Sequence, residues 1–167
     1  MPSIGARHQA PRRPSRAHSF RGLLPRLSAL AAARRTDARS HRRREALHHF
    51  NRGVLMAEEG MVFAAVEAYA RAMESGDADL AARGAFNIAT LSVQAGDLGW
   101  ALLNYSTAIG YGDSDVTPKA AFNLARLLER EGDLDGARTA LQLAAESNHQ
   151  QVAPQAIDRL RSLGAGH

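Results

Sequence analysis

Histidine, aspartate and glutamate are the side chains of this sequence that could hold a metal or transfer protons. His48 and His49 are adjacent, so on a helix they point in different directions and do not clamp one metal ion together. Glu58 and Glu59 stand at a predicted helix end, where neighbouring acids are usually solvated. Cysteine is absent, which excludes disulfides, thiolate zinc sites and a cysteine nucleophile.

Short catalytic motifs are missing as well. The sequence has no His-Glu-x-x-His, no glycine-rich phosphate loop and no Gly-x-Ser-x-Gly. We therefore expect a protein that is not an enzyme, with no catalytic residue, no metal ligand and no cofactor.

Charge is divided unevenly along the 167 residues. Residues 1–44 hold twelve arginines and one acid, Asp37, for a net charge of +11. The rest of the chain holds nine basic and sixteen acidic residues, for a net charge of −7. Arginine alternates with proline, serine, histidine and alanine in the first part, and such a composition buries too little apolar surface to order itself. We predict a disordered basic tail over residues 1–45, with one short amphipathic helix near 26–35.

A repeat of 36 residues organises the remainder of the chain. Phe-Asn pairs recur at Phe50-Asn51, Phe86-Asn87 and Phe122-Asn123. Four further columns keep the same register: Gly60, Gly96 and Gly132; Ala65, Ala101 and Ala137; Tyr69, Tyr105 and Leu141; Ala72, Ala108 and Ala144. Columns in register over three copies predict three copies of one structural unit.

Each copy has the pattern of two helices joined by a turn. Apolar spacing is helical before each glycine, and alanine, ring and alanine at i, i+4 and i+7 share one face of the second helix. Gly96-Asp97 and Gly132-Asp133 provide a helix-ending glycine and an N-cap carboxylate. The predicted helices cover residues 46–59, 62–74, 81–95, 98–109, 118–131, 134–146 and 154–163. Between copies, Gly76, Gly112 and Asn148 share a slot for which we expect left-handed backbone.

These columns resemble the tetratricopeptide repeat family. The resemblance covers residues from about 46 to 153, with a capping helix to 163. Three family positions differ. The tryptophan slot holds His49, Ala85 and Ala121, the Leu-Gly slot holds Arg52-Gly53, Ile88-Ala89 and Leu124-Ala125, and the closing-proline slot holds Asp77, Asp113 and His149. A period of 36 residues, where the family usually has 34, favours a bacterial 36-residue variant or the related Sel1-like repeats. The resemblance implies an all-α, right-handed solenoid of three helix-turn-helix repeats plus a C-terminal capping helix.

In this family the first helices line a concave groove that takes a peptide or helix of a partner, so the resemblance implies a protein-binding scaffold or adaptor. By correspondence, the groove residues are Phe50, Asn51, Arg83, Phe86, Asn87, Lys119, Phe122, Asn123, Arg126 and Arg130. The asparagines can donate to backbone carbonyls or to a terminal carboxylate, and the bases favour an acidic segment. Packing is the alternative, with the Phe column joining helix pairs and the Asn column bonding a neighbouring repeat.

The basic tail has several competing interpretations. It is a solvated extension or a mis-assigned translation start, a polyanion-binding arm, a targeting peptide, or a segment that docks on an acidic repeat domain. The nucleic-acid or polyanion hypothesis uses Arg12, Arg13, Arg34, Arg35, Arg42, Arg43 and Arg44. No apolar stretch approaches the roughly 20 residues of a membrane-spanning helix. We expect a cytoplasmic protein, or an organellar or exported one if residues 1–35 are a targeting peptide.

We predict two parts in the chain. The tail covers residues 1–45 and the repeat domain covers 46–167. Within the domain, the repeats lie at about 46–81, 82–117 and 118–153, and the cap at 154–163.

Overall fold

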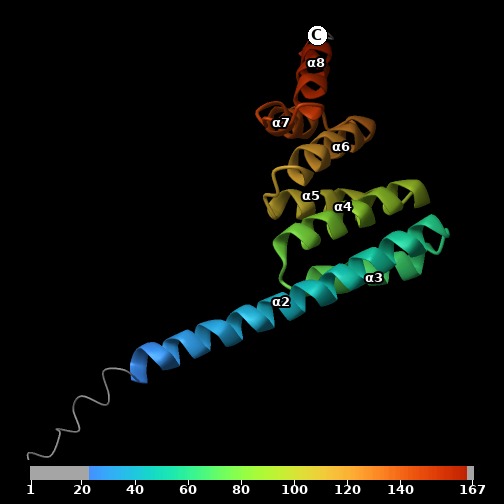
Figure 1. Ribbon diagram of the computed structural model, residues 1–167. Helices are drawn as coiled ribbons and strands as arrows, with labels where there is room; N and C mark the ends of the chain where they lie inside the picture. The colour runs from blue at the N-terminus through green and yellow to red at the C-terminus, as the bar shows by residue number, and fades with distance from the viewer. Residues whose placement is uncertain (1–22, 165–167) are drawn as a thin grey trace, which may run out of the picture. The chain divides into compact units, whose positions relative to one another are not determined.

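The computed structural model describes residues 23–164, whose regular elements are all α-helices (Figure 1). The helices are α2 (Leu23–Glu58), α3 (Val62–Glu74), α4 (Ala78–Ala95), α5 (Leu98–Gly110), α6 (Val116–Glu131), α7 (Leu134–Ala145) and α8 (Val152–Gly164). The predicted all-α class is confirmed. Helices α3 to α8 lie where the repeat predicts them, although α4, α6 and α8 begin two or three residues earlier than expected.

From α3 onward, each helix packs against the next one in the chain, and α4 also contacts α6 while α6 contacts α8. Figure 1 shows the resulting stack of helix pairs, with the turns inside the pairs along one side. This is the arrangement of a short α-solenoid, in which each pair buries its apolar face against its neighbours.

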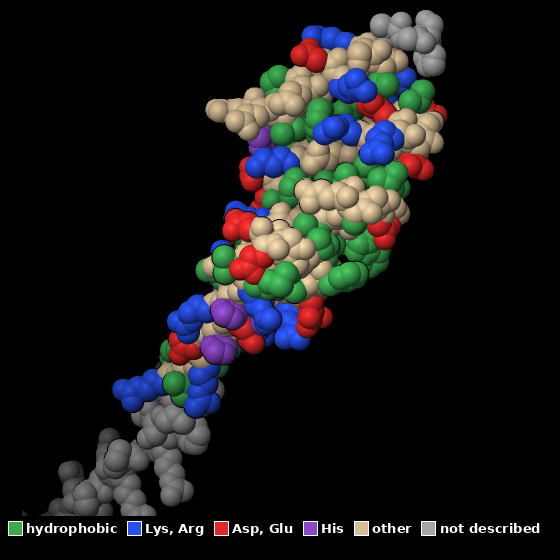
Figure 2. All heavy atoms as spheres, turned by 90° about the vertical axis from the view of Figure 1, so that its right-hand side faces the viewer, with side chains coloured by type: hydrophobic (Ala, Val, Ile, Leu, Met, Phe, Trp, Pro, Cys, Tyr) green, Lys and Arg blue, Asp and Glu red, His purple; other side chains and the backbone are tan. Residues whose placement is uncertain are grey.

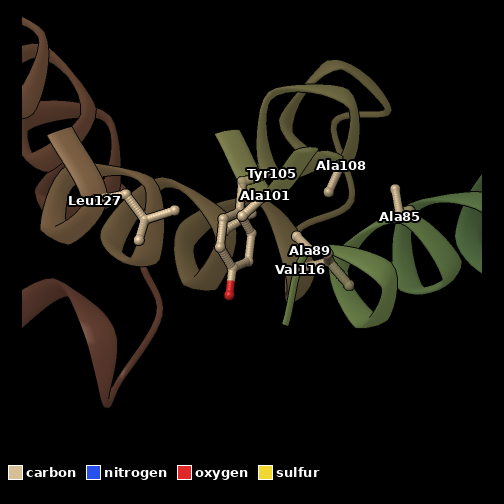
Figure 3. Packing of buried hydrophobic residues seen from close by; sticks show 9 residues of the cluster. Ala85, Ala89, Ala101, Tyr105, Ala108, Val116 and Leu127 are labelled. Atoms are coloured by element: carbon tan, nitrogen blue, oxygen red, sulfur yellow. The ribbon is translucent and has the colours of Figure 1, made fainter. Parts of the chain in front are cut away.

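Alanine lines the contacts between the helices of each pair. The six alanines of the two second-helix columns are fully buried, and the intervening Tyr69, Tyr105 and Leu141 are at most 3% exposed. Figure 3 shows Tyr105 in the central cluster, with Leu127 on one side of it and Ala89 on the other. Side chains this small let helix backbones approach closely, which explains how a chain with few aromatic residues builds a close-packed core.

The turns within the pairs follow the sequence prediction. Gly96 and Gly132 end α4 and α6 with left-handed backbone, at φ of 79° and 84°. The Asp97 and Asp133 carboxylates then accept backbone N–H groups of the next helix, from Trp100 at 3.0 Å and Gly136 at 2.9 Å. Both caps satisfy donors that a helix start leaves unpaired.

The turns between copies contain a second set of caps, at the slot where the tetratricopeptide family has its closing proline. Asp77 accepts the Leu80 N–H, and Asp113 accepts the Val116 N–H. His149 takes the same role in the last copy, its Nδ1 accepting the Val152 N–H at 3.2 Å. These acceptors start the following helices earlier than hydrophobic periodicity alone predicts.

The expectation for Asn148 was wrong. Gly76 and Gly112 have the left-handed backbone predicted for their slot, with φ of 77° and 70°, but no residue other than glycine has positive φ within the described range. His149 caps α8 without that conformation at the preceding residue, so the third turn is built differently from the first two.

Helix α2 differs from the disordered tail expected over residues 23–45 and contains the short helix predicted near 26–35, whereas residues 1–22 of the predicted tail lie outside the described residues. It begins at Leu23 and runs without interruption through residues 23–45 into the first copy. Alanine, leucine and arginine favour helix, Pro25 stands in the first turn where proline is tolerated, and neither proline nor glycine follows before Gly53. Because extending an existing helix costs far less than nucleating one, a composition too polar for a core still continues the helix. The chain divides into two units between Arg39 and Ser40.

The first copy carries polar residues where the later copies are buried. Arg44 is exposed, whereas the equivalent Leu80 and Val116 are buried. Arg52 is likewise exposed, while the equivalent Ile88 is 3% exposed. These substitutions keep one end of the described stack hydrated, as terminal solenoid repeats require.

The capping helix α8 is tied to the stack by an ion pair. Arg159 occupies the slot of the asparagine column, and its guanidinium bonds both oxygens of Glu129 on α6. The Glu129 side chain is only 10% exposed, and the pair raises the pKa of Arg159 further above its usual value. No helix within residues 23–164 is long and apolar enough to cross a membrane.

Candidate partner-binding groove

An open groove of about 360 Å³ lies between the first and second copies. Its lining comes from α2, α3 and α4 and consists of Val54, Ala57, Glu58, Tyr69, Asn87, Thr90, Leu91 and Gln94. The apolar members belong to the core cluster that contains Tyr69 and Leu91, or pack against it. The other lining residues, Glu58, Asn87, Thr90 and Gln94, add polar groups. The groove therefore offers apolar surface together with hydrogen-bonding groups, which is the usual composition of a ligand-binding cleft.

Tyr69 connects this groove to the core. The residue is 3% exposed, and this burial raises the pKa of its phenol above the usual value. A hydrogen bond with the Asn87 side chain lowers that pKa, and the charge of Glu58 raises it. The phenol is therefore neutral near neutral pH, and the Asn87 side chain that shares the groove with it comes from the next copy.

The same arrangement recurs one copy further on. Asn123 Nδ2 donates to the Tyr105 hydroxyl over 3.4 Å, and Thr90 Oγ1 lies 3.3 Å from that hydroxyl. The asparagines of the second and third copies thus contact the tyrosine of the preceding copy. Asn51, which has no preceding copy in the described stack, is exposed.

The phenylalanine column packs against the second helix of its own copy. The ring centroids of Phe50 and Tyr69 are 5.4 Å apart, and those of Phe86 and Tyr105 are 5.6 Å apart. Phe122 packs on the cluster that contains Leu141. Packing therefore accounts for these three half-buried rings, and their role in binding remains a prediction.

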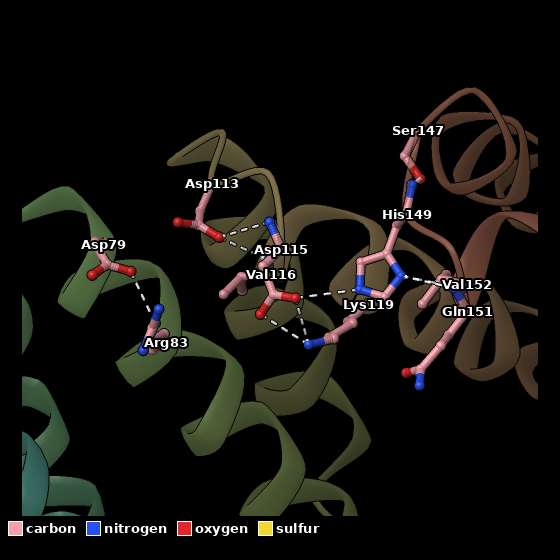
Figure 4. Close-up of polar contacts among 10 residues, drawn as sticks. All are labelled: Asp79, Arg83, Asp113, Asp115, Val116, Lys119, Ser147, His149, Gln151 and Val152. Atoms are coloured by element: carbon pink, nitrogen blue, oxygen red, sulfur yellow. Dashed lines mark hydrogen bonds and ion pairs between the residues drawn. The ribbon is translucent and has the colours of Figure 1, made fainter.

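The basic residues of the predicted groove fall into two classes. Arg83 Nε lies 2.9 Å from Asp79, and Lys119 Nζ lies 2.8 Å from Asp115 (Figure 4). Hydrogen bonding by Lys119 lowers the pKa of the Asp115 carboxyl despite the opposing effect of partial burial. Each base is thus paired with the aspartate four residues before it in the chain.

Arg126 and Arg130 form the second class. Both are exposed on α6, and neither has a carboxylate within 4.0 Å in the described part of the chain. They occupy the repeat slots of Thr90 and Gln94, which line the groove. The third copy therefore continues the groove face with two cations available to a ligand.

His149 completes the polar network beside the third copy. Its Nδ1 accepts backbone N–H groups from Gln151 and Val152, so Nε2 carries the proton and faces Asp115 Oδ1 at 3.3 Å (Figure 4). The repeat pattern showed this histidine as a departure from the family. Its capping role would have followed from reading the Asp77, Asp113, His149 column as N-cap residues.

The predicted tail arginines are distributed along α2 and beyond it. Arg12 and Arg13 lie outside the described residues, whereas Arg34 and Arg35 are exposed on α2. Within the repeat unit, Arg42 and Arg44 are exposed, and Arg43 bonds Asp77 at 2.7 Å and approaches Asp79 at 3.5 Å. Arg43 thus has a structural partner. Within residues 23–164, no group of three potential metal ligands comes together.

Comparison with known proteins finds likeness in structure alone. No protein-family model matches the sequence, and the search of curated proteins gives no match. Among solved structures, the N-terminal domain of stress-induced protein-1 (STI-1) from C. elegans has a TM-score of 0.65 at 14% sequence identity, covering 74% of this chain and 97% of that domain.

Two further structures have the same arrangement. The first TPR of Spaghetti (RPAP3), bound to the HSP90 peptide SRMEEVD, has a TM-score of 0.59 at 16% identity, covering 74% of this chain and 93% of that one. The Yersinia enterocolitica type III secretion translocator chaperone SycD has a TM-score of 0.58 at 16% identity, covering 71% and 82%. The chain therefore has a tetratricopeptide-like helical-repeat fold. A closer relation to Sel1-like repeats stays a prediction.

Proposed function

We propose that this protein is an interaction scaffold whose first helices bind a peptide or helical segment of a partner protein. The observation that carries the proposal is the groove of about 360 Å³, which is lined mainly by α2 and α4 and contains Asn87 from the predicted groove residues. Its apolar members Val54, Ala57 and Leu91 would hold a side chain, and Asn87 would bond the backbone of the segment.

The charge of this face changes from copy to copy. One slot holds Glu58, Gln94 and Arg130, all exposed, so its charge runs from negative through neutral to positive. A bound segment would therefore place its acidic part at the third copy, near Arg126 and Arg130. In the solved RPAP3 complex, the bound HSP90 peptide SRMEEVD is also acidic at its end, which supports an acidic ligand here.

Selection from a peptide display library tests this proposal. The full chain should enrich acidic peptides, and Arg126→Gln together with Arg130→Gln should weaken their binding about tenfold or more. Asn87→Ala should weaken binding through the lost backbone contact, and its stability should be measured in parallel because Asn87 also bonds Tyr69. Leu143→Ala, on exposed surface of α7, is the matched control. Equal binding by all variants would exclude the groove.

A second candidate function is binding of a nucleic acid or other polyanion through α2. The observation that favours it is the exposure of Arg34, Arg35 and Arg39 on a regular helix with Asp37 as the only acid among residues 23–44. A helix holds such cations at regular spacing, and phosphate contacts of this kind need no base stacking.

Filter binding to generic DNA and RNA at several salt concentrations tests this candidate. Arg34→Gln with Arg35→Gln should lower the slope of log affinity against log salt by about one to two, because each phosphate contact contributes about 0.9 on B-DNA. Arg71→Gln serves as control, since Arg71 pairs with Glu67 on α3. An unchanged slope would argue that these arginines make no phosphate contact.

A further inference from the structure

The turn between α2 and α3 departs from the repeat at two positions. Met61 stands where Asp97 caps α5 and Asp133 caps α7, and α3 accordingly has no side-chain cap. Phe63 stands where the second copy has Gly99, and its side chain is 92% exposed. Met61 and Phe63 are therefore not the residues that would stabilise this turn best. Positions of this kind often belong to a functional surface.

Exposed apolar side chains surround Phe63. Leu55 is 56% exposed, although the equivalent Leu91 and Leu127 are buried. Met61 and Val62 are exposed too, so four apolar residues within nine positions of the chain face solvent at one turn. We call Leu55, Met61, Val62 and Phe63 the apolar turn patch. Several exposed apolar side chains at one turn are typical of a docking site.

The same side of the solenoid continues the apolar surface on α5. The α2–α3 and α4–α5 turns lie along one side of the stack (Figure 1), and α5 exposes Trp100 and Leu103 just after its turn. Figure 2 looks onto this side and shows hydrophobic and acidic side chains together across its middle. Phe63 and Trp100 are large rings, the kind of side chain that dominates binding at protein interfaces.

Apart from Arg52, which is exposed one turn before Leu55 on α2, the ionised residues next to the patch along the chain are acidic. Residues 53–70 contain three glutamates and no Lys, Arg or His, and residues 84–118 contain three aspartates and again no base. Glu58 and Glu59, which adjoin the patch, are exposed and have no basic partner within 4.0 Å in the described chain. On the opposite side of the solenoid, Asp77, Asp79 and Asp115 are paired with bases. The patch thus combines exposed apolar groups with carboxylates that lack internal partners.

We propose that the apolar turn patch is a second docking surface, for a basic segment of a partner protein that carries an apolar side chain beside its arginines or lysines. Apolar side chains of the segment cover Phe63 and its neighbours, while its cations reach Glu59 and Glu58. The surface adjoins the groove proposed above at Glu58, but Phe63 and Glu59 are not among the groove-lining residues and so distinguish the two sites.

Titration of the full chain with a fluorescein-labelled peptide of alternating arginine and leucine tests the proposal. Anisotropy should show saturable binding, and the emission of Trp100, the only tryptophan, should change during the titration. Binding should weaken with salt between about 50 and 300 mM, because exposed ion pairs are screened. A peptide of alternating glutamate and leucine should not bind.

Phe63→Ala should weaken binding about tenfold and Glu59→Gln a few-fold. The matched controls are Leu134→Ala and Glu131→Gln, because these exposed residues occupy the slots of Val62 and Glu59 in the third copy. They should retain wild-type binding, as should Asn87→Ala in the groove. Circular dichroism should confirm that Phe63→Ala folds, as expected for so exposed a side chain.

Two results would overturn the proposal. Equal affinity of Phe63→Ala, Glu59→Gln and the third-copy controls for the arginine–leucine peptide would show that attraction is general to the acidic protein. Self-association of the wild-type protein in sedimentation, abolished by Phe63→Ala, would show that a second copy occupies the patch instead of a partner.

Discussion

The Asn123 amide donates to the hydroxyl of Tyr105, joining the first helix of the third copy to the second helix of the copy before it. Thr90 on α4 reaches the same hydroxyl, so one oxygen links α4, α5 and α6. This contact explains why an asparagine recurs beside a packing phenylalanine. The Asn123 amide gives the hydroxyl of the buried Tyr105 a hydrogen-bond partner, and this bond crosses the boundary between two copies.

Removing that oxygen should loosen the boundary without creating a cavity. Tyr105→Phe is expected to lower the free energy of unfolding by about 1 kcal/mol, the usual net contribution of one hydrogen bond. Chemical denaturation followed by circular dichroism measures the change. Tyr111→Phe is the control, since Tyr111 is 39% exposed. An equal effect of both substitutions would contradict a role for the Tyr105 hydroxyl.

Close approach of α2 and α3 depends on a glycine. A Cβ built on Gly53 would lie 2.7 Å from two ring atoms of Tyr69. Gly53→Ala should therefore destabilise the protein by about 1–3 kcal/mol, because overpacking outweighs the gain in helix propensity. Gly110→Ala is the matched change, since no atom lies within 4 Å of a Cβ added there. Thermal unfolding should show opposite signs for the two variants.

The imidazole of His149 is an N-cap for α8. His149→Ala should cost about 1 kcal/mol of unfolding free energy, the usual value for a lost cap. His149→Asn should recover most of that loss, because its carbonyl oxygen can accept the same backbone N–H groups. Hydrogen exchange of the Gln151 and Val152 amides should report the loss locally. Equal protection in His149→Ala and the wild type would count against the cap.

Asp115 provides a prediction about pH. Lys119 lowers the pKa of the Asp115 carboxyl by hydrogen bonding, so Lys119→Met should raise this pKa toward its ordinary value of about 3.9. A depressed pKa stabilises the fold above the pKa of the unfolded chain, and the contribution is lost as pH falls through the folded-state pKa. The stability difference between wild type and variant should therefore be present at neutral pH and shrink in acid.

Titration of the Asp115 carboxyl by NMR measures that shift directly. Arg126→Met is the control, since Arg126 has no carboxylate partner among the described residues and should leave the pKa of Asp115 unchanged. A similar shift in both variants would mean that the general field of the third copy, and not the Lys119 contact, sets the pKa.

The helices were predictable because each carries its own local signals. Gly96-Asp97 and Gly132-Asp133 are adjacent in sequence to the helices that they end and start, so their role follows from residue type alone. The extension of α2 over residues 23–45 was missed because composition reports whether a segment can bury a core. Composition does not report whether a segment can prolong a helix that is anchored further along the chain.

From the sequence, only the helix face that carries the candidate groove was predictable. Repeat register placed Asn87 and Thr90 on the first helices. Their contacts with Tyr69 and Tyr105 join residues 15 to 18 positions apart, and the asparagine contact crosses a copy boundary. The division of the cations into paired Arg83 and Lys119 and unpaired Arg126 and Arg130 likewise required side-chain positions.

By itself, the sequence determined the repeat, its period, the helix pairs and the alanine columns that let them pack. These depend on residue type and spacing, which are local properties. Only the tertiary structure decided whether the side chains of each repeated column face the core, a neighbouring copy or the solvent. It turned the phenylalanines inward, bonded Asn123 to the preceding copy and left Phe63 in solvent. The reason is that columns alike in sequence have unlike neighbours in space, and exposure and charge pairing depend on those neighbours.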